Sequence, residues 1–135
     1  MANTTNDIMN EEIVYPELSY EITGLFFKVH NKLGRFCREK QYCDELEKEF
    51  EENGISFKRE FTDKTNNRYD FVIEGKIVIE CKAKHLIDRE DYYQPRRYLQ
   101  ASGHRLGMLV NFRSTYLKPK RVLNPDVEKS DLHHS

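Results

Sequence analysis

The chain has 135 residues, a length that suits one domain with a single hydrophobic core. Charged residues make up 33% of it and no apolar run approaches the length of a membrane span, so the composition indicates a soluble globular protein and excludes a membrane-spanning one. The formal net charge of −1 excludes a chain-wide basic field for nucleic acid and leaves only local basic patches for that purpose. Each patch is otherwise an ordinary solvated surface; the patches are Lys32/Arg35/Arg38/Lys40, Arg96/Arg97 and Lys118/Lys120/Arg121.

The cysteines indicate a compartment. Cys37, Cys43 and Cys81 are an odd number, and the N-terminal residues lack the basic-then-apolar pattern of a secretion signal. This combination predicts reduced thiols and a cytoplasmic location. Cys37 and Cys43 show no zinc-ligand spacing, and the strand position of Cys81 predicts a small core residue.

Two helices are predicted in the first part of the chain, after a polar, flexible arm over residues 1–15. Apolar residues recur at three- and four-residue steps over residues 19–33, which predicts a helix capped by Ser19 and ended by Gly34. A second amphipathic pattern over residues 39–53 predicts another helix, which a glycine again ends.

Strands are predicted next. Residues 55–61 alternate apolar and polar side chains like a half-buried strand, and residues 63–67 are rich in turn formers. The β-branched residues that follow predict a β-hairpin over residues 68–83, which turns at Glu74 and Gly75.

A third helix is predicted after the hairpin. Asp88, with Asp91 three residues later, predicts the cap, and Gly103 predicts the end. Because proline is unfavourable inside a helix, we expect the regular part to begin near Gln94, with Pro95 in its first turn.

The remaining pattern completes an α/β domain over residues 16–123. Residues 105–112 predict a buried strand, and residues 116–123, which include a proline, predict an edge strand where a homodimer can pair. Residues 124–135 are polar and predict a flexible tail. Strands joined by a crossover helix imply a mixed β-sheet flanked by helices.

The turn of the hairpin decides which charged side chains share a face of the sheet. A two-residue loop would pair Asp70 with Ile79 and put Glu80 on the opposite face. A three-residue loop, in which Gly75 supplies a positive φ, keeps Asp70, Glu80 and Lys82 on one face. We predict the three-residue loop.

Charges on such an apolar hairpin are expensive to bury unless they are paired or bind a metal ion. The carboxylates of Asp70 and Glu80, with the backbone carbonyl of Cys81, are oxygen ligands of the kind that Mg²⁺ or Mn²⁺ prefers. Lys82 would orient or deprotonate an attacking water, or neutralise the charge of a phosphoryl transition state. The structural alternative is a cross-strand charge pair on a solvent-facing strand.

Two more residues can complete this site from the predicted helices. Glu39 can hold a metal-bound water, although a carboxylate in the first turn of a helix also suits the helix dipole. Gln94 can orient water or phosphate from the later helix.

An ordered set of short motifs resembles the GxxExxY proteins, small members of the PD-(D/E)XK nuclease superfamily. The set runs from about Leu18 to Leu123 and so covers most of the chain. Its members are Val29-His30-Asn31-Lys32-Leu33-Gly34, Phe36-Cys37-Arg38-Glu39-Lys40-Gln41-Tyr42, Tyr69-Asp70, Ile79-Glu80-Cys81-Lys82-Ala83, Gln94 with Tyr98-Leu99, Ala101-Ser102-Gly103, Leu106-Gly107 and Val110-Asn111-Phe112.

The resemblance implies a restriction-endonuclease-like core, dependence on Mg²⁺ and DNA as substrate. The site residues of the superfamily carry over as Asp70, Glu80 and Lys82, with Glu39 from the helix and Gln94 as the accessory position.

Two positions depart from the family's pattern. Phe36 stands where the naming motif has its glycine, so Glu39 and Tyr42 alone remain of that motif. Pro95 directly follows Gln94.

We therefore predict a metal-dependent nuclease that hydrolyses phosphodiester bonds in DNA. The alternative is a catalytically silent nucleic-acid-binding or protein-interaction module with the same fold. Calorimetry of Mn²⁺ binding to the wild type and to Asp70→Ala separates the metal-site hypotheses from the interaction module.

Overall fold

The computed structural model describes residues 14–62 and 68–126. The predicted turn over residues 63–67 lies outside the described residues, as do most of the predicted arm and tail. The described elements are α2 (Pro16–Leu33), α3 (Glu39–Glu52), β1 (Phe57–Thr62), β2 (Arg68–Ile73), β3 (Ile77–Lys82), α4 (Arg89–Ser102), β4 (Leu106–Asn111) and β5 (Lys120–Leu123).

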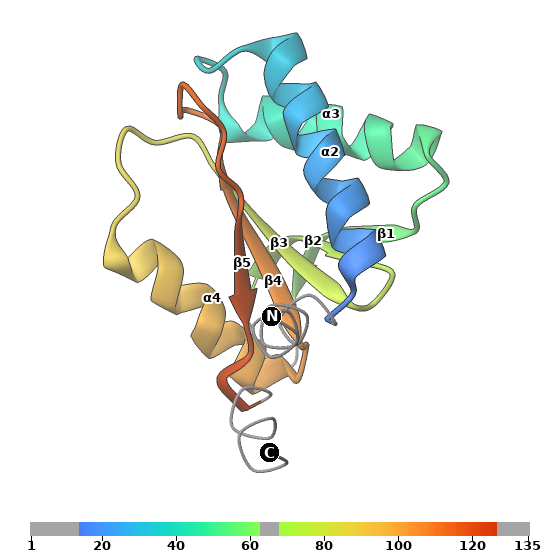
Figure 1. The fold of residues 1–135 in the computed structure, drawn as a ribbon, viewed down its shortest axis with the longest axis vertical. Helices are drawn as coiled ribbons and strands as arrows, with labels where there is room; N and C mark the ends of the chain where they lie inside the picture. Colours follow the sequence, from blue (N-terminus) through green and yellow to red (C-terminus); the bar gives the residue numbers. More distant parts are fainter. Residues whose placement is uncertain (1–13, 63–67, 127–135) are drawn as a thin grey trace, which may run out of the picture.

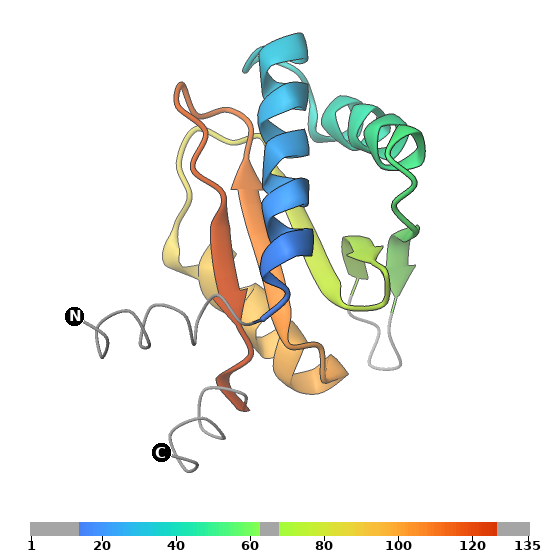
Figure 2. The ribbon, with the colours of Figure 1, turned by 45° about the vertical axis from the view of Figure 1, so that its right-hand side comes forward.

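The five strands form one mixed sheet in which spatial order follows chain order, β1-β2-β3-β4-β5. Only β3 and β4 pair in parallel, and α4 makes the crossover between them. Helices α2 and α3 lie over one face of the sheet and α4 over the other (Figures 1 and 2). The predicted α/β fold with a mixed sheet flanked by helices is confirmed.

Each face of the sheet has its own hydrophobic core, and the two are unequal. The larger core joins α2 and α3 to the sheet through Phe26, Phe50 and Phe71, all fully buried. The smaller core lies under α4, from which Leu99 is the fully buried contributor. Tyr69 on β2 belongs to this smaller core.

Helix α2 begins three residues before the predicted start. Pro16 occupies its first turn, where a missing backbone N–H costs nothing, and Gly34 ends it as predicted. The predicted cap at Ser19 is wrong. The Ser19 hydroxyl donates to the Pro16 carbonyl and accepts from Arg121 Nη1 at 2.6 Å, so it joins the helix to the edge strand instead.

Helix α4 differs from the prediction at its proline. The Asp88 cap is confirmed, because its carboxylate accepts the Asp91 N–H at 3.0 Å. In the reverse direction, the Asp88 N–H donates to the Asp91 carboxylate. The regular helix starts at Arg89 rather than near Gln94, and Pro95 lies inside it. Pro95 is buried, so packing and the capping bonds hold a helix that proline alone disfavours.

The ends of the described chain are packed. Val14, within the expected arm, is 2% exposed. Asn124, the first residue of the expected tail, is buried, and its side-chain amide donates to the carbonyls of Leu99 and His104. None of the described helices combines the length and the hydropathy that a membrane span requires.

Candidate metal and phosphodiester site

The hairpin of β2 and β3 has the predicted register. Phe71 pairs with Ile79 and Ile73 with Ile77, which leaves a three-residue loop from Glu74 to Lys76. Gly75 has the predicted positive φ of 67°. This predicted register places position 70 opposite position 80. Regular alternation of side chains stops at Asp70, because Tyr69 packs in the smaller core and Phe71 in the larger one, so a face shared by Asp70, Glu80 and Lys82 stays a prediction.

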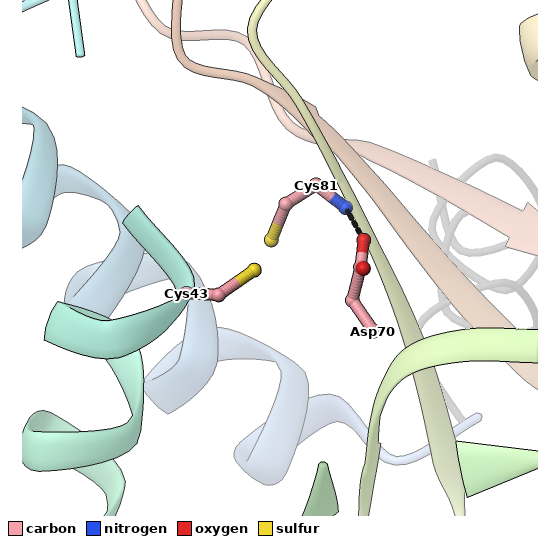
Figure 3. Close-up of side chains that lie close together, drawn as sticks. All are labelled: Cys43, Asp70 and Cys81. Carbon is pink, nitrogen blue, oxygen red and sulfur yellow. Dashed lines mark hydrogen bonds between the residues drawn. The ribbon is translucent and has the colours of Figure 1, made fainter. Parts of the chain in front are cut away.

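Asp70 lies where the two strands stop pairing. The β2–β3 ladder ends at the pair of Phe71 and Ile79. Beyond it, Asp70 Oδ2 accepts the backbone N–H of Cys81 at 2.7 Å (Figure 3). A side-chain carboxylate thus takes the role of a backbone carbonyl, which keeps it half-buried between the strands. Burial raises the pKa of Asp70, and the Cys81 N–H and Lys82 oppose that shift.

Two buried thiols lie beside Asp70. The Sγ atoms of Cys43, on α3, and Cys81 point toward one another (Figure 3). Their sulfur atoms and an Asp70 oxygen all lie within 4.8 Å of one another. The hydrogen bond with Cys43, together with burial, raises the pKa of Cys81 well above its ordinary value. Cys81 is therefore a neutral thiol and, as predicted, a small core residue.

Glu80 is the most perturbed carboxyl group of the site. Burial, and then the charge of Asp70, raises the pKa of Glu80 to about 8, although Lys82 acts in the opposite direction. Its Oε1 atom is buried and has no hydrogen-bond donor among the described residues. A buried acidic oxygen without a donor calls for a cation or a proton. The oxygen donors of Asp70 and Glu80 therefore fit a hard divalent cation.

Glu39 approaches from α3, of which it is the first residue. Burial raises the pKa of Glu39, as does the charge of Asp70, whereas Lys82 and the backbone N–H of Ala83 lower it. The structure therefore brings Glu39 to the same end of the sheet as Asp70, Glu80 and Lys82. The three carboxylates are less tightly gathered than the thiol cluster, since they form no group within 4.8 Å.

Lys82 has a partner that the sequence did not indicate. Its Nζ lies 4.0 Å from Asp91 Oδ1, and Lys84 Nζ lies 2.8 Å from Asp91 Oδ2. Although burial opposes ionisation of Asp91, Lys84 and the Asp88 N–H hold its pKa below the ordinary value. Asp91 was predicted only as part of a helix cap, and the contact depends on how α4 docks onto the sheet.

Asn111 fixes the segment that follows Lys82. Its Oδ1 accepts the Lys84 N–H at 3.1 Å and its Nδ2 donates to the Lys84 carbonyl at 2.8 Å. In addition, Phe112 N–H donates to the Lys82 carbonyl at 2.9 Å. The ends of β3 and β4 are therefore held together directly beside the charged cluster.

Gln94 is the one predicted site residue that stays apart. Its amide donates to the Tyr98 hydroxyl, one turn further along α4. In the described structure it makes no hydrogen bond to Glu39, Asp70, Glu80 or Lys82, and its accessory role stays a prediction.

Comparison with known proteins agrees with this arrangement. A family model described as the PD-(D/E)XK nuclease superfamily matches residues 16–122, which include every residue of the site. No curated protein and no solved structure matches the chain.

Proposed function

Because the chain belongs to the PD-(D/E)XK nuclease superfamily, we propose that it is a metal-dependent nuclease that hydrolyses phosphodiester bonds in DNA. The observation that carries this proposal is the Glu80 carboxylate. Its Oε1 is buried near Asp70 and Lys82 and lacks a donor within the described residues.

The ligand set follows from the chemistry of the donors. Asp70, Glu80 and the Cys81 carbonyl would hold Mg²⁺ or Mn²⁺, with Glu39 acting through a water. The bound ion would lower the pKa of a coordinated water and stabilise negative charge on the phosphoryl oxygens.

The chain's own residues supply the rest. The Lys82 ammonium, directed by Asp91, would orient the attacking water and neutralise charge in the transition state. Asn111 holds the backbone that follows Lys82, so the ammonium is presented from a fixed strand end. Gln94 would join the site as the accessory residue only after leaving Tyr98.

One observation favours the second candidate, a DNA-binding module that does not cut. Glu39, Asp70 and Glu80 are not drawn into one compact group. Such a module would bind DNA with salt-dependent affinity and show no turnover. The closer GxxExxY relationship, the cytoplasmic location and a homodimer paired through β5 remain predictions.

Substitutions of three site residues test catalysis directly. Glu80→Gln, Asp70→Asn and Lys82→Ala are each expected to lower the cleavage rate of plasmid and oligonucleotide DNA with Mg²⁺ or Mn²⁺ by about 100-fold or more. Asn at position 70 keeps an oxygen to accept the Cys81 N–H, so the fold is preserved. Calorimetry should show weakened Mn²⁺ binding in Asp70→Asn and Glu80→Gln.

Glu51→Gln, at an exposed position on α3, is the matched control and should cut like the wild type. Equal cleavage by the wild type and all three site variants would show that another site or a contaminant cuts. Metal-independent, salt-sensitive binding without cleavage would favour the silent module.

A further inference from the structure

We infer that Phe36, with Arg35 and Arg113, forms a platform on which an unpaired nucleobase stacks, so that the substrate is DNA containing unpaired bases. This inference rests on the proposed function and names the substrate class of the same site.

Phe36 is a large apolar side chain left in solvent. It lies in the α2–α3 loop, three residues before Glu39, and is 74% exposed. A phenylalanine ring this exposed gains little hydrophobic stabilisation from folding. The position therefore fits a side chain whose partner lies outside the chain.

Two guanidinium groups lie over the Phe36 ring, which remains 74% exposed to solvent. The Cζ atom of Arg35 lies 4.7 Å and that of Arg113 5.5 Å from the centre of the Phe36 ring. Within the described residues, neither arginine has a carboxylate partner. Two cations gathered without a counter-charge complement the phosphates on either side of a stacked base.

The platform is held rigidly. Arg35 Nε donates to the Arg113 carbonyl at 2.8 Å, and Arg113 Nε donates to the Arg35 carbonyl at 3.1 Å. These reciprocal bonds join the α2–α3 loop to the loop after β4, and the two loops lie side by side in Figures 1 and 2. The outer nitrogen atoms of both guanidinium groups have no hydrogen-bond partner in the part of the chain that the structure describes.

Tyr42, on α3, also fixes the α2–α3 loop. Its hydroxyl donates to the Gly34 carbonyl at 2.6 Å and accepts the Cys37 N–H at 3.2 Å. Its ring stacks on Phe112, with centroids 4.3 Å apart and planes at 8°. Because these bonds already fix the loop that carries Phe36, stacking of a base on it would cost little conformational entropy of the protein.

The platform adjoins the charged cluster. Arg113 follows Phe112, whose N–H binds the Lys82 carbonyl, and Glu39 begins the helix that follows Phe36. A strand stacked on Phe36 would therefore pass close to Asp70 and Glu80. Stacking needs an exposed π-face, which single-stranded or branched DNA offers and the interior of a duplex does not.

The test measures binding and cleavage on the same DNA. Fluorescence anisotropy in EDTA compares a labelled single-stranded 20-mer, roughly the length of a few binding sites, with its blunt duplex. Phe36→Ala is expected to weaken single-strand binding by about 10-fold and to leave duplex binding nearly unchanged. Phe36→Trp should retain single-strand affinity. Tyr20→Ala, at an equally exposed aromatic on α2 (82%), should have no effect.

The salt dependence tests the arginines. Arg113→Gln should reduce the slope of log affinity against log salt by about 0.7 on the single strand, because one phosphate contact is lost. Equal affinity of Phe36→Ala and wild type for both DNAs would overturn the inference, and so would a loss of the same size on duplex. A complete lack of binding to single-stranded DNA would also overturn the inference, and Phe36 would then face another kind of partner.

Failure of the platform and failure of the nuclease remain distinguishable. Phe36-dependent binding without any metal-dependent cleavage would support the platform and contradict the nuclease. The opposite result has two parts. Glu80→Gln would lose cleavage, while Phe36→Ala and the wild type would cut single strand and duplex identically. That result would support the nuclease and contradict the platform.

Discussion

At the residue scale, Glu80 dominates the electrostatics of the metal-free site. Its folded pKa of about 8 lies above the ordinary value of 4.5, so the folded protein retains a proton that the unfolded chain releases. The resulting stability is fully present below about pH 4.5 and is lost as the pH rises through about 8. Asp70, whose pKa is also raised, contributes in the same direction.

Chemical denaturation in EDTA checks this sign. The free energy of unfolding of the wild type should fall between about pH 5 and pH 8, with Glu80 alone contributing at most about 1.4 kcal/mol per pH unit, and then level off. Glu80→Gln should remove the Glu80 part of this slope, because the amide does not titrate. Asp91, with its lowered pKa, adds an opposite slope only at lower pH. An unchanged slope in Glu80→Gln would mean that another group is responsible.

The residue scale also shows where sequence reasoning stopped. Glu80 and Lys82 could be identified because charges are rare on an apolar strand. The contact between Cys43 and Cys81 could not, since nothing in the spacing of two residues 38 positions apart indicates which helix face meets which strand. The pairing of Asp91 with Lys82 was hidden for the same reason.

At the element scale, the hairpin turn sets the geometry of the site. Gly75 has a φ of 67°, where an added Cβ is strained even in open space. Gly75→Ala is expected to lower the free energy of unfolding by about 1 kcal/mol.

Gly24→Ala is the matched control, for which we expect a change in the free energy of unfolding of the opposite sign. Gly24 lies inside α2, and a Cβ at this position would meet no other atom within 4 Å. Alanine there should raise the free energy of unfolding by about 0.5–1 kcal/mol. Urea denaturation of both variants measures the difference, and stabilisation by Gly75→Ala would contradict the strained turn.

Elements were predictable where local signals agreed with packing. The register followed from loop parity, and α3 followed from its apolar face and its glycine stop. Helix α4 was misjudged because proline has a strong local preference that burial of Pro95 overrides. The start of α2 was missed because Pro16, rather than a polar cap at Ser19, sets it.

At the scale of the whole molecule, the site is assembled across the sheet from two layers. Glu39 comes with α3 over the larger core, and Asp91 comes with α4 over the smaller one. Correct placement of Lys82 therefore depends on the docking of the less strongly packed helix.

Hydrogen exchange should reveal this asymmetry. The amides of α4 are expected to open at a lower free energy than those of α3, because only Asp91, Pro95 and Leu99 of α4 are buried. Leu99→Ala should increase the difference between the opening free energies of α3 and α4 and lower the free energy of unfolding by about 2–4 kcal/mol. Native-state exchange read by mass spectrometry measures both helices at once. Exchange of α4 at the same free energy as α3 would contradict an independent opening.

The hydrogen bond from the Cys81 N–H to Asp70 has an evolutionary consequence. A lineage that ceased to cut would still need an acceptor at position 70 to close the end of the β2–β3 ladder. Selection for folding alone would then retain Asp or Asn there. The Glu80 carboxyl group also receives a backbone hydrogen bond from Asp70, and only its Oε1 atom lacks a donor within the described residues. Among homologues, an Asp or Asn at position 70 is therefore by itself no marker that separates enzymes from their silent descendants.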